Sequence, residues 1–314
     1  MVEKTARLSY PANRWWHQLF APNRLLPYLL IAPAIIALLV FVVVPVLFSL
    51  YLSLTNAELL RFDQREFIGF DNYERLLARN VFWTSLSNTL VYTAGSVILS
   101  FGAGLFTALL LNQNFRFRGL ARTMISIPWA VPWLVTTTIW YVMFNPQMGP
   151  INEVLKELGL IQTGIPWLYQ NSTAMIAIVI VTAWRIFPTA TLLILAGLQS
   201  IAPDLYEAAK VDGANAWQRF RHVTMPSLRS VNLVVIVLLT ITAFKLFTVA
   251  WTLTQGGPGT ATTVISVYTY QEAFMSNRIG RASALATVSV LVSSVLVVVY
   301  YLLIGPEEHK SEAA

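Results

Sequence analysis

The sequence predicts an all-α integral membrane protein with six transmembrane helices and with both termini in the cytoplasm. Of its 314 residues, 56% are hydrophobic and 11% are charged, and the mean hydropathy is +0.61. A soluble domain could not bury that much apolar surface, and six segments are long enough to cross about 30 Å of hydrocarbon as helices. We expect these spans at residues 28–54, 88–111, 121–144, 173–197, 231–254 and 284–304.

The first span follows Arg14 and Arg24, as the apolar core of a signal peptide would. It is longer than such a core, contains Pro33 and Pro45 and lacks a small-residue cleavage site, so we expect an uncleaved anchor. The chain then divides into a cytoplasmic tail (1–27), a transmembrane domain (28–304) and a second cytoplasmic tail (305–314). Trp15 and Trp16 suit an anchor at the membrane interface.

Lysine and arginine are distributed unevenly between the two sides of the membrane. Twelve lie on the side of the termini and of the loop 199–230: Lys4, Arg7, Arg14, Arg24, Arg116, Arg118, Arg122, Lys210, Arg219, Arg221, Arg229 and Lys310. Seven lie on the other side: Arg61, Arg65, Arg75, Arg79, Lys156, Arg278 and Arg281. The positive-inside rule therefore places the loop 199–230 in the cytoplasm. The net charge of +6 follows this pattern and does not indicate a nucleic-acid partner.

Several function classes are disfavoured by residues that the sequence lacks. It has no cysteine, its three histidines are far apart, and no GxxxxGK[ST] phosphate loop occurs, so we expect neither a metal site nor ATP hydrolysis by this chain. All 15 acidic residues fall outside the predicted spans. This argues against an ion-coupled carrier, although backbone carbonyls can also bind sodium, and against a membrane-bound enzyme that needs paired carboxylates.

The loop between the fourth and fifth spans contains the helix-prone segment EAAKVDGANAWQRFRHVTMP, residues 207–226. Pro203 ends the preceding apolar run, and Asp204 with Glu207 fits a capping box. Gly213 suits the left-handed residue after a helix, and a second helix is expected from Asn215 to about residue 222, ending before Pro226. These residues alone fit either a linker helix on the bilayer surface or a surface for a soluble partner.

Five residues of this loop resemble, at the same spacing, the EAA loop of binding-protein-dependent ABC importer permeases: Glu207, Ala208, Ala209, Gly213 and Pro226. The resemblance implies the type I ABC importer permease fold and a coupling helix that docks on a cytoplasmic ATPase. Asp212 and Ala214 are similar to the sugar and glycerol-phosphate branch in particular. The implied coupling residues are therefore Glu207, Ala208, Ala209, Asp212, Gly213 and Ala214.

The third span contains IPWAVPWL, which places Trp129 and Trp133 one helical turn apart on one face. Pro128 and Pro132 would distort this helix and open a concavity, and indole rings suit a ring-shaped hydroxylated ligand; ordinary packing is the alternative. The motif resembles the third span of maltose-type importers, where these positions line the sugar site. The same resemblance implies solute contacts at Ile186, Thr242, Ala243 and Leu246. Apolar residues replace several amides of the maltose pattern there, which argues against maltose itself.

Two cations fall within predicted spans, Arg185 in the fourth and Lys245 in the fifth. Each fits snorkelling, pairing with the backbone of a partner subunit, or a contact with a polar or anionic solute. Outside the membrane, residues 67–77 and 151–160 are expected to form short amphipathic helices, either as interfacial caps or as a docking surface for a solute-binding protein. The TQGGP segment, residues 254–258, predicts a tight turn at the end of the fifth span.

The resemblance implies one multi-pass permease subunit of the cell membrane that imports a sugar or related polyol. A glycerol-3-phosphate-type solute is the alternative, and an ion-coupled carrier is less favoured. The implied partners are a homologous second permease, two ATPase subunits that bind ATP and Mg²⁺, and an extracytoplasmic solute-binding protein. No cofactor is expected in this chain.

Overall fold

The computed structural model describes residues 22–304, and side chains from residue 28 to residue 303. The tails 1–21 and 305–314, with the predicted anchor at Trp15 and Trp16, lie outside the described residues. The described chain forms two compact parts, with the division between Leu52 and Ser53. All regular structure in the described range is helical, apart from one isolated bridge between Thr55 and Phe67.

The first part is one long apolar helix that begins as α2 (Pro22–Leu38), widens into a π-helical turn, η1 (Leu39–Val43), and continues as α3 (Val44–Ser53). The stretch Tyr28–Ser53 is long and apolar enough to cross a membrane, as the sequence predicts. Pro45 does not break it. The wide turn η1 ends two residues before Pro45, where a missing backbone N–H would otherwise interrupt the helix.

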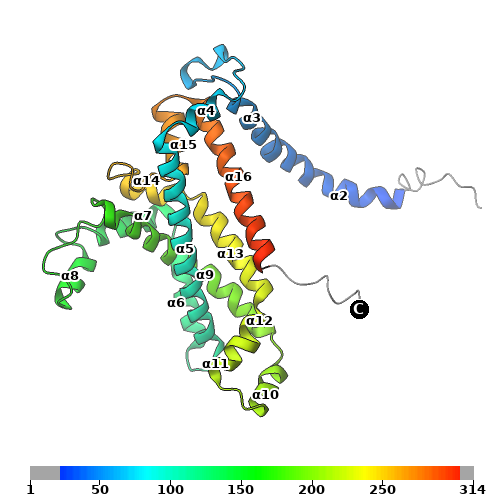
Figure 1. Ribbon diagram of the computed structural model, residues 1–314. Helices are drawn as coiled ribbons and strands as arrows, with labels where there is room; N and C mark the ends of the chain where they lie inside the picture. Colours follow the sequence, from blue (N-terminus) through cyan, green and yellow to red (C-terminus); the bar gives the residue numbers. More distant parts are fainter. Residues whose placement is uncertain (1–21, 305–314) are drawn as a thin grey trace, which may run out of the picture. The chain divides into compact units, whose positions relative to one another are not determined.

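The second part is built around α9 (Asn171–Ser200), which packs against α5 (Asn80–Asn112), α6 (Arg118–Ala130) and α13 (Arg229–Phe244). The helix α16 (Ile279–Ile304) packs against α13 (Figure 1). Gly104 lets α5 approach α9 closely, since a Cβ added there would lie 2.5 Å from the Cβ of Ala190. Hydroxyl pairs join the two helices, with 2.6 Å between Tyr92 Oη and Thr182 Oγ1. Small residues and paired hydroxyls are the usual means of joining helices in lipid.

Two predicted spans are broken in the structure. In the third, α6 and α7 (Trp133–Met143) meet at an angle of 95°, so the segment 121–144 is a bent helix pair and the distortion expected from its prolines is observed. Pro132 supplies no N–H to a helix, and the residue before it, Val131, is extended.

The predicted fifth span, 231–254, is also not one helix. The helix α13 ends at Phe244, and α14 (Thr248–Thr254) begins after Lys245–Phe247. No proline or glycine stands at this break. Tertiary contacts hold it, because Leu246 joins a buried apolar cluster and the hydroxyl of Ser266 donates to the Leu246 carbonyl over 3.3 Å.

By length and composition, the described residues contain four helices that could each cross a membrane. They lie at Tyr28–Ser53, Asn80–Asn112, Asn171–Ser200 and Ile279–Leu303. The number rises to six if each of two bent helix pairs is one span, namely α6 with α7, and the helical run Ala216–Ser227 with α13, bent by 70°. Asp and Glu are absent from all of these segments in the described range, as predicted.

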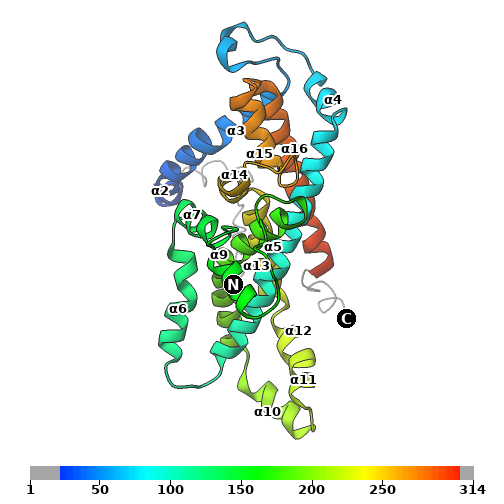
Figure 2. The same ribbon diagram turned by 90° about the vertical axis from the view of Figure 1, so that its left-hand side faces the viewer.

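The two ends of the second part carry different short helices (Figure 2). One end holds α10 (Pro203–Val211), α11 (Ala216–Arg219), the π turn η3 (Phe220–Thr224) and α12 (Met225–Ser227). The other end holds α4 (Asp71–Leu77), α15 (Ile265–Tyr270) and η4 (Gln271–Met275). The helices α4 and α8 (Pro150–Glu157) confirm the two short helices expected at 67–77 and 151–160.

A buried ion-pair cluster closes the end that holds α4 and α15. Glu272, with 4% of its surface exposed, lies 3.0 Å from Arg79 Nη1 and 3.5 Å from Arg281 Nη1. The three residues come from the start of α5, from η4 and from α16, so the cluster fixes three elements.

The predicted turn at 254–258 is confirmed, with Gln255 and Gly256 at positive φ and a 2.6 Å contact between the hydroxyls of Thr254 and Thr262.

Candidate functional site

The predicted coupling loop folds into a helical hairpin, which we define as α10 through α12, residues 203–227. The first helix begins two positions earlier than a capping box at Asp204 and Glu207 requires. Ala202 is the N-cap, Pro203 occupies the first helical turn, and no side chain caps this end. The predicted box at Asp204 and Glu207 is therefore wrong, because proline at the first helical position places Asp204 inside the helix.

The capping box instead opens the second helix. Asn215 Oδ1 accepts from the backbone N–H of Gln218 over 2.9 Å, and Gln218 Oε1 accepts from the backbone N–H of Asn215 over 2.7 Å. This confirms the predicted start of the second helix at Asn215. Its predicted end before Pro226 is wrong, because the helical run continues to Ser227. The π turn η3 lies immediately before and widens the helix where Pro226 lacks a donor.

The bend of the hairpin is held by backbone geometry. Gly213 has a φ of +78°, which confirms its predicted left-handed conformation. The N–H of Ala214 donates to the Ala209 carbonyl over 2.9 Å, and that of Gly213 donates to Lys210 over 3.0 Å, which satisfies carbonyls at the end of α10. Arg219 Nη1 donates to the Ala214 carbonyl over 2.7 Å and ties the second helix back to the bend.

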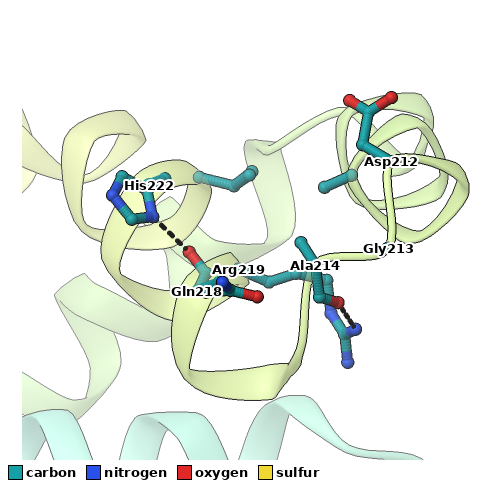
Figure 3. Close-up of a pocket in the computed structure, with 8 residues that line it drawn as sticks. Asp212, Gly213, Ala214, Gln218, Arg219 and His222 are labelled. Atoms are coloured by element: carbon teal, nitrogen blue, oxygen red, sulfur yellow. Dashed lines mark hydrogen bonds between the residues drawn. The ribbon is translucent and has the colours of Figure 1, made fainter.

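A groove of about 410 Å³ lies between the two arms of the hairpin (Figure 3). Four of the predicted coupling residues line it: Ala209, Asp212, Gly213 and Ala214. The other two, Glu207 and Ala208, are exposed on α10 outside this lining. The opposite wall consists of Gln218, Arg219, His222 and Val223, which the motif did not identify. Their spacing of four residues, 218 with 222 and 219 with 223, already placed them on shared faces of the second helix.

Large apolar side chains on this otherwise polar hairpin are exposed. Val211 is 87% exposed, Trp217 is 66% exposed and Leu205 is 51% exposed. Leu205 and Val211 lie on α10, and Trp217 lies on α11. The motif did not identify these residues, although their position in a polar loop was a sequence signal.

The hairpin is attached to the helix bundle at its base. Leu228, fully buried, follows α12 and packs in an apolar cluster with Leu111 of α5 and Leu198 of α9. A hydrogen bond of 3.0 Å joins Tyr206 Oη of α10 to Thr224 Oγ1 of η3. A displacement of the hairpin would therefore reach α9 and α13 through packed side chains.

A second hollow lies inside the bundle, at the break between α6 and α7. It has a volume of about 250 Å³ and is lined by Trp129, Trp133, Arg185, Ile186, Thr189, Leu238, Leu239 and Thr242. The prediction that the two tryptophans share one helical face is wrong, because the helix breaks between them at Val131 and Pro132. The break nevertheless brings both indoles to one cavity. Thr189, Leu238 and Leu239 were not predicted; each lies three or four residues from a predicted site residue or from Arg185.

Arg185 contacts both sides of that break. Its Nε donates to the Val131 carbonyl over 2.9 Å, and its Cζ lies 4.9 Å from the centre of the Trp133 ring. The pairing is with a backbone carbonyl of the same chain, whereas the pairing expected from the sequence was with a partner-subunit backbone.

The other predicted solute residues do not line this cavity. Ala243 is fully buried, Leu246 packs in an apolar cluster that Trp133 borders, and Lys245 is exposed where α13 ends. No acidic residue is among the cavity-lining residues. Groups of three or more His, Cys, Asp or Glu side chains that could hold a metal are absent from residues 22–304.

Broken apolar helices around a partly polar cavity, with a polar hairpin at one end of the bundle, define a membrane transport protein. The chain belongs to the family of binding-protein-dependent transport system inner membrane components, which matches residues 100–307. The family and the location in the inner membrane that the sequence predicts are thereby confirmed.

Relatives with curated names agree with this assignment. The chain is 38% identical over 281 residues to the trehalose/maltose transport system permease protein of Thermococcus litoralis, covering 89% of this chain and 93% of the relative. It is 37% identical over 295 residues to the sulfoquinovosyl glycerol transport system permease protein of Agrobacterium fabrum, covering 94% and 95% of the two chains.

A solved structure has the same fold. It is the crystal structure of a bacterial ABC transporter involved in the import of the acidic polysaccharide alginate. The TM-score is 0.78 and the identity 25%, over 93% of this chain and 98% of that chain. A second structure, with the same TM-score, contains that transporter in complex with an alginate pentasaccharide-bound periplasmic protein. The predicted importer permease fold is therefore confirmed.

Proposed function

We propose that this permease carries a sugar or a related polyol that an extracytoplasmic binding protein delivers. The observation that carries the proposal is the cavity at the α6–α7 break. Two indole rings, Trp129 and Trp133, offer flat apolar faces, and Thr189 and Thr242 offer hydroxyls. Sugars have apolar ring faces and polar edges, so this combination suits them. The names of the relatives, which refer to trehalose, maltose, sulfoquinovosyl glycerol and alginate, support the same class.

Within this proposal, Trp129, Trp133, Ile186 and Thr242 contact the solute in the cavity. Ala243 is fully buried, and Leu246 packs in the apolar cluster that Trp133 borders, so neither would contact the solute directly in this cavity. Lys245 would meet the solute only outside this cavity, at the exposed end of α13.

We further propose that the hairpin is the contact with a cytoplasmic ATPase. Glu207, Ala208, Ala209, Asp212, Gly213 and Ala214 would form the docking surface together with the exposed Val211 and Trp217. The ATPase pair would bind ATP and Mg²⁺, and this chain would hydrolyse neither ATP nor solute. A homologous second permease would complete the translocation path, because six helices rarely enclose a large solute alone. Two features support this role: the groove between the arms and the packed joint at Leu228.

The solute proposal is tested by replacing Trp133 with alanine in the assembled transporter. We expect uptake of labelled trehalose, maltose or sulfoquinovosyl glycerol, whichever the wild type takes, to lose affinity about tenfold, equivalent to about 1.4 kcal/mol. Trp83→Ala is the matched control, since Trp83 is exposed at the start of α5 and does not line the cavity. Equal uptake by Trp133→Ala and wild type would remove the cavity from the transport path.

A phosphorylated polyol is the second candidate, and Arg185 in the cavity lining favours it. Competition separates the candidates. Excess glycerol 3-phosphate should abolish uptake if the solute is phosphorylated, and neutral disaccharides should abolish it if the solute is a neutral sugar. Uptake that persists in vesicles without any ATPase would instead identify an ion-coupled carrier.

The coupling proposal is tested by the double substitution Glu207→Lys with Gly213→Pro. We expect the ATPase to be lost from the purified complex, because the substitutions reverse a charge on α10 and block the left-handed bend. Glu157→Lys with Gly159→Pro is the matched control, since Gly159 also has a positive φ, of +69°, at the end of α8. Retention of the ATPase and of transport by the first variant would refute the coupling role.

A further inference from the structure

The break between α6 and α7 leaves backbone carbonyls without helical partners. A helix end exposes its last four carbonyl groups, and in a membrane each unsatisfied group costs several kcal/mol. Pro132 has no backbone N–H that could donate to one of these carbonyls, and Val131 leaves the helix in an extended conformation. The Val131 carbonyl instead accepts the Nε–H of Arg185 from α9, over 2.9 Å.

The same guanidinium also contacts the first residue of the next helix. Arg185 Cζ lies 4.9 Å from the centre of the Trp133 ring, within the range of a cation–π interaction. Trp133 begins α7 and lines the cavity. One side chain therefore holds the backbone before Pro132 and the indole after it.

This arrangement uses properties that arginine has and lysine lacks. A planar guanidinium can donate from its edge to a carbonyl while its face lies over an aromatic ring. An ammonium group has no planar edge and face, so it could not make both contacts in the same way. No acidic residue lines the cavity, so in this lining the charge of Arg185 is balanced by a carbonyl and a ring rather than by a carboxylate.

We propose that Arg185 is a positioning residue that fixes the α6–α7 bend and the orientation of Trp133, and that the shape of the cavity depends on this contact. Its effect on solute affinity then passes through Trp133. That consequence rests on the proposed function, whereas the geometry of the bend does not.

The absence of cysteine from the whole sequence permits a direct test with paired spin labels. One pair reports on the bend: Met124→Cys on α6 with Ile139→Cys on α7, both exposed positions. A reference pair reports on the packing of α5 against α9: Ile98→Cys with Leu192→Cys, also exposed. Distances are measured by pulsed electron paramagnetic resonance on the full chain in lipid nanodiscs, without solute.

We expect Arg185→Leu to broaden or shift the 124–139 distance distribution and to leave the 98–192 distribution unchanged. Arg185→Lys should behave like Arg185→Leu, because it keeps the charge and loses the two-sided contact. Trp133→Ala should broaden the 124–139 distribution less than Arg185→Leu does, since the bond to Val131 remains.

Three results would overturn the proposal. The first is an unchanged 124–139 distribution in Arg185→Leu, which would leave direct solute contact as the role of this arginine. The second is broadening of both label pairs, which would indicate a general requirement for folding. The third is full recovery in Arg185→Lys, which would show that charge alone suffices. Because no solute is present, failure of the solute proposal would not alter any of these readouts.

Discussion

The hairpin and the cavity are built in opposite ways. The hairpin is one continuous stretch, residues 203–227, and its bend is held by hydrogen bonds between residues no more than five positions apart, such as Ala214 with Ala209 and Arg219 with Ala214. The cavity gathers side chains from residues 129–133, 185–189 and 238–242, more than 45 positions apart. A local element keeps its shape when its surroundings move, whereas a cavity shared by several helices changes when any of those helices moves.

The local hydrogen bonds of the hairpin and the shared walls of the cavity suit a protein in which the hairpin moves and the cavity changes shape in response. The hairpin can be displaced as a unit because its hydrogen bonds are internal. The cavity lining includes α9 and α13, which are two of the helices that contribute to the apolar cluster of Leu228 at the base of the hairpin. We therefore expect the joint between hairpin and bundle to be the most sensitive point of the molecule.

The largest effect should come from Gly197→Val, which would disrupt the packing between α9 and the base of the hairpin. A Cβ added at Gly197 would lie 2.8 Å from Leu228 Cδ2 and 3.0 Å from Val231 Cγ2. Overpacking of this kind costs about 1–3 kcal/mol, and here it would separate α9 from the base of the hairpin. We expect a lower midpoint of thermal unfolding for the purified protein in detergent.

Gly102→Val is the control for Gly197→Val. Gly102 lies within α5, and an added Cβ there would meet nothing within 4 Å. Its unfolding midpoint should stay near that of the wild type. Equal losses from the two substitutions would show that the packing at Leu228 is not special, and the hairpin would then not be joined to the cavity as described.

The same difference explains what the sequence could predict. The helical hairpin, its bend at Gly213 and the start of its second helix follow from local rules, and the structure confirms all three. The sequence alone does not identify which helix the capping box opens, because Asp204 with Glu207 and Asn215 with Gln218 both fit the pattern. Only the observed N-cap at Ala202 separates them.

The cavity was less predictable because its geometry depends on contacts between distant residues. Pro128 and Pro132 both signalled distortion, yet only Pro132 lies at the break, and Pro128 remains inside α6. The break after Phe244 carried no local signal at all, since Leu246 and Ser266 hold it through tertiary contacts. The hydrogen bond between Arg185 and Val131 joins residues 54 positions apart, so local sequence rules could not predict it either.

An intermediate effect, confined to the hairpin, is expected from Gly213→Val. At a φ of +78° a β-branched residue is strained, and a left-handed L-residue costs about 1–2 kcal/mol. No atom lies within 4 Å of the added Cβ, so the effect comes from the backbone alone. Hydrogen exchange should quicken across residues 203–227 and stay unchanged in α9.

Gly213→Asn sharpens this prediction, because asparagine tolerates the left-handed region better than valine. It should restore most of the protection that valine removes. If α9 also loses protection in the valine variant, the hairpin is not a local element and the contrast with the cavity is lost.

The smallest effect should come from Asn215→Ala. Together with Asp204→Ala, it tests which of the N-termini of α10 and α11 is stabilised by a side-chain cap. Loss of the Asn215 side chain removes a bond of 2.9 Å to Gln218, which costs about 1 kcal/mol and should speed amide exchange in residues 216–219 about fivefold. Asp204→Ala removes a charge near the start of α10 but no capping bond, so exchange in α10 should change less. A larger effect from Asp204→Ala would mean that α10, and not α11, is the helix whose cap stabilises the hairpin. In that case α10, which precedes Gly213, would contribute more than α11 to the stability of the bend.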